Sequence, residues 1–254
     1  MQNKKIERDK LVSIIMPLYN VERFIAQTIE SVLIQSYHHF ELLIVDDKST
    51  DNSVKIVKRY MKEDNRIRLF FLDVNSGPVR ARNKAIKEAK GKYISFLDSD
   101  DMWVPDKLQQ QIVFLNENSL VLTYSTYETM DENSMYINTR DCLPLITYKD
   151  MLKSNRIGNL TGMYDVGFFG KVYMEDIGHE DYVMWLHLLK KIPFTKGIEE
   201  PLAQYRILSS SISSNKIKAL VWQWHIYREV EKLNFFQSFY YFGHYVYNAV
   251  KKRT

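Results

Sequence analysis

The chain of 254 residues has a single cysteine, Cys142. One thiol excludes an intrachain disulfide framework and is typical of a reducing compartment. Prolines and glycines are also few, at 6 and 9, and they form no low-complexity linker. No uncharged apolar run reaches the roughly 20 residues that a membrane-spanning helix requires. These features argue against a disulfide-rich protein, a mainly disordered chain and an integral membrane protein.

The composition is otherwise that of a globular protein, with 45% hydrophobic and 26% charged residues. The net charge of +4 is uneven, because seven Lys/Arg face only two acids from Lys216 onward. No nucleic-acid-binding motif accompanies this basic segment, so we expect no nucleic-acid partner. The apolar run Leu11–Leu18 follows a basic start but has no cleavage pattern after it, so we expect a cytoplasmic protein.

The first half alternates apolar runs with amphipathic segments. The predicted strands are Leu11–Met16, Glu41–Val45, Ile67–Leu72 and Tyr93–Leu97. The predicted helices between them are Val21–Ser36, capped by Asn20, then Asn52–Lys62 and Val79–Ala89. The strands are continuously apolar, which favours burial on both faces. This alternation predicts an α/β fold with a parallel sheet covered by helices.

The second half is less regular. It contains a predicted helix at Pro105–Asn118, a strand at Ser119–Tyr127, an irregular insertion at Asp131–Leu145 and a helix at Asp181–Lys191. Two terminal helices are predicted at Lys216–Lys232 and Phe235–Val250.

Polar residues follow each predicted strand of the first half, and ligands of open α/β sheets bind beyond the carboxyl ends of strands. After the fourth strand come Asp98, Asp100 and Asp101. Carboxylates so close together repel one another, and hard divalent cations prefer such oxygen ligands. A strand-end loop that caps a helix would need only one acid. The pattern therefore favours binding of a metal and a diphosphate.

Other candidate residues have two interpretations. Asp46 and Asp47 can accept hydrogen bonds from a base or sugar, or can cap the following turn. Gly77 permits close backbone approach to phosphates, and the helix after it carries Arg80, Arg82 and Lys84, which can face an anion or solvent.

Acids also stand at the start of a later helix. Glu180 and Asp181 follow His179 there, where acids are favoured by the helix dipole. One of the two can also act as a general base, with Trp185 packing to position the helix.

Taken together, the segments VSIIMPLYN, IVDDKSTDNS, NSGPVRARNKAIKEAKGKYISFLDSDDMW, HEDYVMWLHLL and AQYRILSSSIS occur in the order of a known family. The chain resembles the inverting family-two glycosyltransferases, which have the GT-A fold of nucleotide-diphospho-sugar transferases. The resemblance covers roughly residues 11–213. It implies a Rossmann-like first half, a mixed but mostly parallel sheet and a helical tail.

The resemblance also implies roles for individual residues. Asp181 would be the catalytic base, with Glu180 beside it, and Asp98-Ser99-Asp100 matches the Asp-x-Asp motif. Asp100, with Asp98, would bind Mn²⁺ or Mg²⁺. The implied donor-binding residues are Pro17, Tyr19, Asp46, Asp47, Gly77, Arg82, Asn83, Asp98 and Ser99. Asp101 lies outside the motif spacing and is expected only to cap the turn toward Pro105.

The implied activity is transfer of one sugar from a nucleotide-diphospho-sugar, with UDP as the expected nucleotide, to a bacterial surface glycan or its lipid-linked precursor. Lys48 departs from the family pattern, because glycine is common there. The alternatives are a catalytically silent nucleotide-sugar-binding scaffold and a nucleotidyltransferase on a similar fold.

We expect an extension at residues 1–10, a catalytic domain at 11–213 and a basic, aromatic tail at 214–254. The catalytic domain divides into a donor half, 11–101, and an acceptor half, 102–213. Aromatic and basic residues in 235–253 suit either an anionic membrane surface, at the inner face of the cell membrane, or packing against the body or a second copy in a homodimer.

Overall fold

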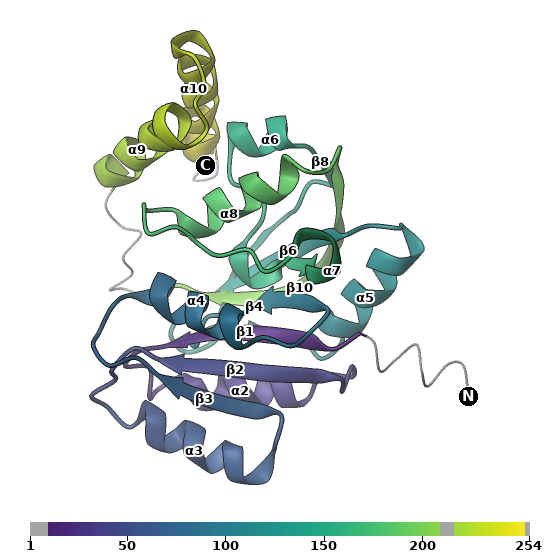
Figure 1. Ribbon diagram of the computed structural model, residues 1–254, viewed down its shortest axis with the longest axis vertical. Coiled ribbons are helices and arrows are strands. Elements are labelled where there is room, and N and C mark those ends of the chain that lie inside the picture. The colour runs from purple at the N-terminus through teal and green to yellow at the C-terminus, as the bar shows by residue number, and fades with distance from the viewer. Residues whose placement is uncertain (1–9, 209–215, 252–254) are drawn as a thin grey trace.

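The computed structural model describes residues 10–208 and 216–251, and its centre is one mixed sheet (Figure 1). Four parallel strands form one side of it, in the order β3-β2-β1-β4. They are β1 (Val12–Leu18), β2 (Phe40–Asp46), β3 (Ile67–Phe71) and β4 (Tyr93–Phe96). All four were predicted. Burial on both faces is confirmed for β1, β2 and β4, whereas β3 is only partly buried because it is the edge strand of this side.

Helices cover both faces of this parallel part. They are α2 (Ile25–Leu33), α3 (Ser53–Glu63), α4 (Pro78–Glu88) and α5 (Lys107–Glu117). Apolar residues of α2, α3 and α5 share one core cluster, and those of α4 belong to the other. The predicted helices are therefore confirmed. The cap assigned to Asn20 is wrong, because α2 begins four residues later than predicted and its N-cap position is Phe24.

The other side of the sheet mixes directions. β9 (Met163–Asp165) runs antiparallel to β4, β6 (Leu122–Met130) runs antiparallel to β9, and β10 (Thr195–Arg206) runs parallel to β6. Three short strands complete it, namely β5 (Met102–Trp103), β7 (Tyr136–Arg140) and β8 (Leu145–Ile146). The predicted α/β fold with a mixed, mostly parallel sheet is confirmed. Residues 131–145 were expected to be irregular, and they instead supply β7 and the start of β8.

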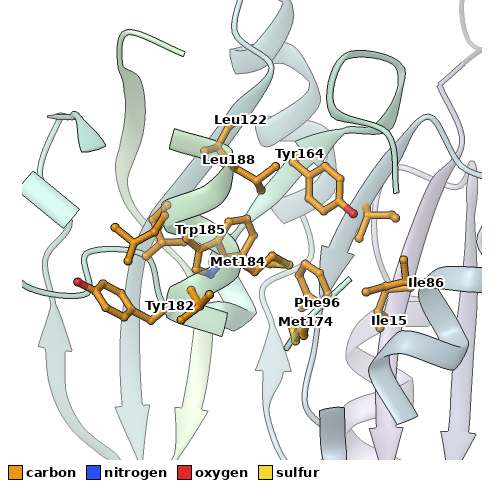
Figure 2. Close-up of a cluster of buried hydrophobic side chains, with 14 of the residues drawn as sticks. Ile15, Ile86, Phe96, Leu122, Tyr164, Met174, Tyr182, Met184, Trp185 and Leu188 are labelled. Atoms are coloured by element: carbon orange, nitrogen blue, oxygen red, sulfur yellow. The ribbon is translucent and has the colours of Figure 1, made fainter. Parts of the chain in front are cut away.

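Between these strands lie four short or medium helices. They are α6 (Tyr148–Lys153), the 3₁₀ turn η1 (Asn159–Thr161), α7 (Val166–Phe169) and α8 (Glu180–Leu189). An aromatic cluster holds α8 on the sheet. Figure 2 shows Trp185 of α8 close to Phe96 and Tyr164, with ring centroids 5.7 and 6.5 Å from the indole. The side chain of Trp185 is fully buried, so α8 is anchored by one of the largest apolar groups in the core.

The C-terminal region folds as two helices, as predicted. α9 (Lys216–His225) continues through a π-helical turn, η3 (Ile226–Val230), and α10 (Phe235–Lys251) follows. Ile226 and Tyr227 are fully buried in the same core cluster as α8. None of the helices in the described ranges is long and apolar enough to cross a lipid bilayer.

Candidate active site

Side chains link the loops that follow the carboxyl ends of the parallel strands. Asp47, after β2, accepts hydrogen bonds from the backbone N–H groups of Ser76 and Gly77, after β3, at 2.7 and 2.8 Å. Asp46 accepts from Ser49 N at 3.1 Å. Both buried acids therefore support the turns, which was one of the two interpretations of the sequence.

The loops after β1 and β2 are joined by Asn20. Its side-chain oxygen accepts a hydrogen bond from Thr50 N at 2.8 Å, in place of the helix cap expected for it. Lys48, in the second of these loops, has φ +69°. This left-handed conformation costs an ordinary residue roughly 1–2 kcal/mol, which explains why glycine suits the position. Pro17 lies within β1, and Tyr19 beyond it is 48% exposed at the same edge.

α4 begins at this edge and contributes the side chains of Asn83 and Arg82. Gly77 precedes it with φ +85°, a conformation that favours glycine. Asn83 faces the loop before α8, where its amide donates to Met174 O and accepts from Met174 N, both at 2.8 Å. Asn83 therefore ties α4 to the segment that leads into α8.

Arg82 connects the two groups of acids. Its Nη2 lies 2.7 Å from Asp98 Oδ1, and its Nη1 lies 3.0 Å from Glu180 Oε1. Burial alone would lower the pKa of this guanidinium, but the charges of Asp98 and Glu180 raise the pKa above its usual value. The buried cation thus brings the end of β4 and the start of α8 together, although Asp98 and Glu180 are 82 positions apart.

The acids after β4 have different surroundings. Burial, and then the charge of Asp98, raise the pKa of Asp100 to about 6. No ion pair of the Asp100 carboxylate occurs within residues 10–208 and 216–251. Ser99 between them is buried, and its carbonyl accepts from Thr28 Oγ1 at 3.0 Å.

Asp101 does not act as the cap toward Pro105 that the sequence predicted. Its carboxylate is buried and accepts a hydrogen bond from Arg206 N, at the end of β10, at 2.8 Å. Arg206 also donates from Nε to Asp100 O at 2.8 Å. Arg206 was not among the predicted site residues. Its position in the AQYRILSSSIS segment was the available signal, and the serines at 209–213 lie outside the described residues.

Asp181 lies in the first turn of α8. Burial, and then the charge of Glu180, raise the pKa of Asp181, whereas the charge of Arg82 opposes the shift. Asn155 Nδ2 lies 3.4 Å from Asp181 Oδ2. A carboxylate with a raised pKa in a half-buried position is a candidate proton acceptor.

A pair of tyrosines is associated with both groups of acids. Tyr127 and Tyr205 pack edge to face, with ring centroids 6.4 Å apart. Burial is the main reason that the pKa of Tyr127 is raised, and the charges of both Asp101 and Asp181 add to it. This ring is therefore within electrostatic range of both groups, and no sequence motif had indicated it.

The end of β4 offers carboxylate oxygens that could bind a cation. No group of three or more His, Cys, Asp or Glu side chains in the described part of the chain is arranged to hold a metal ion. The Asp98–Asp100 pair nevertheless suits a hard divalent cation, because the charge of Asp98 raises the pKa of Asp100 and a cation bound to both carboxylates would relieve this repulsion.

Comparisons with known proteins show the family of the chain. The family model described as "Glycosyl transferase family 2" matches residues 13–175. The chain is 44% identical to glycosyltransferase TuaG of Bacillus subtilis, a protein named for teichuronic acid biosynthesis, over 96% of this chain and 97% of the relative. It is 38% identical to the UDP-Glc:alpha-D-GlcNAc-diphosphoundecaprenol beta-1,3-glucosyltransferase WfgD of Escherichia coli, over 97% and 96%.

Solved structures show the same fold. S. aureus TarS 1–349 in complex with UDP-GlcNAc superposes with a TM-score of 0.70 at 20% identity, covering 87% of this chain and 67% of that one. The mannosyltransferase PcManGT of Pyrobaculum calidifontis, in complex with GDP-Man and Mn²⁺, gives 0.64 at 15% identity, covering 89% and 65%. On the family match and the close relatives, this chain belongs to glycosyltransferase family 2 and is an enzyme with the GT-A fold.

Proposed function

We propose that the enzyme transfers one sugar from a UDP-linked donor to a hydroxyl group of a bacterial surface glycan or a lipid-linked precursor, with inversion at the anomeric carbon. The observation that carries this proposal is the Arg82 bridge between Asp98 and Glu180. It holds the acids suited to a metal diphosphate beside the helix that carries the candidate base. The names of TuaG and WfgD support the surface-glycan and lipid-linked acceptors.

The donor would lie along the carboxyl edge of β1, β2 and β4. In this proposal Pro17, Tyr19, Asp46 and Asp47 border the nucleotide, with the two acids acting mainly through the loops that they support. Gly77 and Arg82 lie closer to the diphosphate. Asn83 contributes indirectly, because both of its amide groups are used by Met174.

Asp98 and Asp100 would hold Mn²⁺ or Mg²⁺, with Ser99 setting their spacing. A bound divalent cation would supply charge stabilisation for the departing UDP. Two protein carboxylates suffice for such a site when diphosphate oxygens provide further ligands. Deprotonation of Asp100, whose pKa is about 6, would accompany binding.

Asp181 would take the proton of the acceptor hydroxyl while the hydroxyl oxygen attacks the anomeric carbon. The bond from that carbon to the diphosphate breaks in the same step, and UDP leaves from the opposite face. Arg82 pairs with Glu180 in the same turn, and its positive charge favours the ionised form of Asp181, whereas the charge of Glu180 opposes it. A single displacement of this kind inverts the anomeric configuration.

The test uses a purified enzyme with UDP-sugars, Mn²⁺ and lipid-linked GlcNAc acceptors. Asp181→Asn is expected to lower kcat by about 100- to 10,000-fold, the range for a general base. Asp176→Asn is the matched control, because Asp176 is an exposed acid in the loop before α8. Full turnover of Asp181→Asn would contradict the base, and an NMR assignment of retained configuration would contradict inversion.

Two other functions give different outcomes. A binding scaffold would bind UDP without turnover on any donor and acceptor pair. A nucleotidyltransferase would release pyrophosphate in place of UDP. The Asp98–Arg82–Glu180 bridge favours transfer, because a scaffold would need no base beside the acids.

We also propose peripheral binding of the tail, 214–254, to anionic membrane at the cytoplasmic face. α10 has no acidic residue, and its exposed side includes Phe236 and Phe239, at 84% and 67% exposure. Phe236→Ser should reduce sedimentation with anionic vesicles, whereas Phe168→Ser, an exposed phenylalanine of α7, should not. Equal binding of both variants would favour the alternative, a homodimer contact. Lys252 and Arg253 lie outside the described residues.

A further inference from the structure

Gly178, in the turn that leads into α8, lies against the indole ring of Trp222 in α9. Gly178 has φ +78°, and a Cβ atom added there would lie 2.4 Å from Trp222 Cδ2. No side chain fits in that space without displacing the indole. Figure 1 shows α9 and the start of α8 at the same end of the molecule. The close approach therefore requires glycine for two independent reasons, its conformation and its contact with Trp222.

The next residue is in the same unusual conformation. His179 has φ +52°, and its side chain makes no hydrogen bond as the N-cap of α8. Its ring packs edge to face on Trp222, with centroids 5.4 Å apart. Left-handed backbone at a residue other than glycine persists only where the surroundings hold it. The Trp222 ring packs on His179 and thereby supports this backbone conformation.

A second contact joins α9 to the first turn of α8. Gln223 is buried, and its Nε2 donates to the hydroxyl of Tyr182 at 3.2 Å. Tyr182 in turn donates to Met151 O at 3.0 Å. Asp181 lies between His179 and Tyr182 in the chain, so α9 contacts the residue before the Glu180–Asp181 pair and the residue after it.

We infer that Trp222 and Gln223 are positioning residues, which hold the start of α8 so that the Asp181 carboxylate is placed for proton transfer. This inference rests on the proposed function, since it takes Asp181 as the base. A base must come within about 2.6–3.2 Å of the proton donor. A displacement of 1 Å can cost roughly 100-fold in rate. A helix start with two left-handed residues depends on its neighbours for that accuracy.

The chain contains a matched comparison. Trp224 lies on the same helix, two residues after Trp222, but its ring packs against Phe235 and Phe242, at 6.1 and 5.5 Å. Trp224 therefore joins α9 to α10, whereas Trp222 joins α9 to the turn before α8. Substitutions at the two positions remove the same side chain from different contacts.

The kinetic experiment compares Trp222→Ala, Trp222→Phe and Trp224→Ala in the full-length enzyme. Trp222→Ala is expected to lower kcat by about 10- to 100-fold, with the KM for the UDP-sugar changed by less than about twofold, because donor contacts are retained. Trp222→Phe should recover most of the loss, since an aromatic ring can still pack on His179. Trp224→Ala should retain kcat within about threefold.

Hydrogen exchange supplies a readout that does not depend on turnover. In Trp222→Ala, amides 180–184 should exchange faster than in the wild type, and in Trp224→Ala they should not. Unchanged exchange in Trp222→Ala, or equal losses of kcat in both alanine variants, would overturn the inference. Full turnover of Asp181→Asn would overturn the proposed base instead, so the two failures can be distinguished.

Discussion

Replacing Arg82 with methionine tests whether a buried cation joins the two halves of the site. The Arg82 side chain is 8% exposed, and its guanidinium contacts Asp98 and Glu180 at 2.7 and 3.0 Å. Methionine is close in length to the apolar stem of arginine and is flexible, so Arg82→Met removes the charged group while retaining most of the packing of the stem. The variant leaves two carboxylates facing each other without their shared cation.

The expected loss of stability follows from how much water can reach those carboxylates. Removing one partner of a fully buried ion pair costs about 3–5 kcal/mol. The Asp98 and Glu180 side chains are 32% and 22% exposed, so solvent partly compensates for the lost cation. We therefore expect the free energy of unfolding to fall by about 2–3 kcal/mol. Arg82→Lys should lose less, because an ammonium group can still pair with one of the two acids.

Urea unfolding followed by tryptophan fluorescence gives the measurement. Glu180→Gln completes a double-mutant cycle with Arg82→Met, and a coupling of about 1–2 kcal/mol is expected. Arg23→Met is the control, because Arg23 pairs with Glu132 at 64% exposure and surface pairs contribute about 0–1 kcal/mol. If Arg82→Met cost no more than Arg23→Met, the bridge would not be a significant connection between β4 and α8.

Three further outcomes are expected. Asp100→Asn should weaken Mn²⁺-dependent UDP binding at least about tenfold by calorimetry, while binding of UDP alone is retained. Lys48→Gly should raise the free energy of unfolding by about 1 kcal/mol, because it relieves a left-handed residue, and Lys48→Ala should not. Lys107 is fully buried, and burial lowers its pKa well below the usual 10.5. The unfolded chain then binds this proton more tightly, so wild-type stability relative to Lys107→Met should increase as the pH rises from 7 toward 10.5, as measured by urea unfolding. The absence of this increase would mean that Lys107 stays charged in the fold.

The parallel strands were predictable because their apolar runs are local. The residues of β1, β2 and β4 are buried on both faces of the sheet. Their continuous apolar runs therefore identify them as strands without knowledge of the strands they pair with. β10 was not predicted. It carries Lys196, Glu199, Glu200 and Pro201, and its register with β6 shifts on both sides of Pro201. Such a strand forms because of the strands that it pairs with, and these cannot be read from its own sequence.

The candidate acids were predictable because they also form local patterns in the sequence, whereas their contacts were not predictable. Arg80 and Arg82 lie two residues apart on α4 and have the same side chain, yet Arg80 is exposed and Arg82 is buried. The difference arises from Glu180, which lies 98 residues further along the chain. Asn83 likewise contacts the distant residue Met174. Arg206 contacts Asp100 and Asp101, which are also distant in the sequence.

The position of α8 depends on three contacts from two distant parts of the chain, α4 and α9. Arg82 of α4 pairs with Glu180, Asn83 binds the backbone of Met174, and Trp222 covers Gly178. Each contact acts on the segment of residues 174–180, which has little regular structure of its own before α8 begins. Two of the three contacts come from a helix that starts at the proposed donor site, and the third comes from a helix joined to the exposed aromatic side of α10. Events at the donor site and at the C-terminal helices therefore act on the same short segment. We expect the geometry of Asp181 to be sensitive to both, since the contacts from α4 and from α9 act on the segment that leads directly into the first turn of α8.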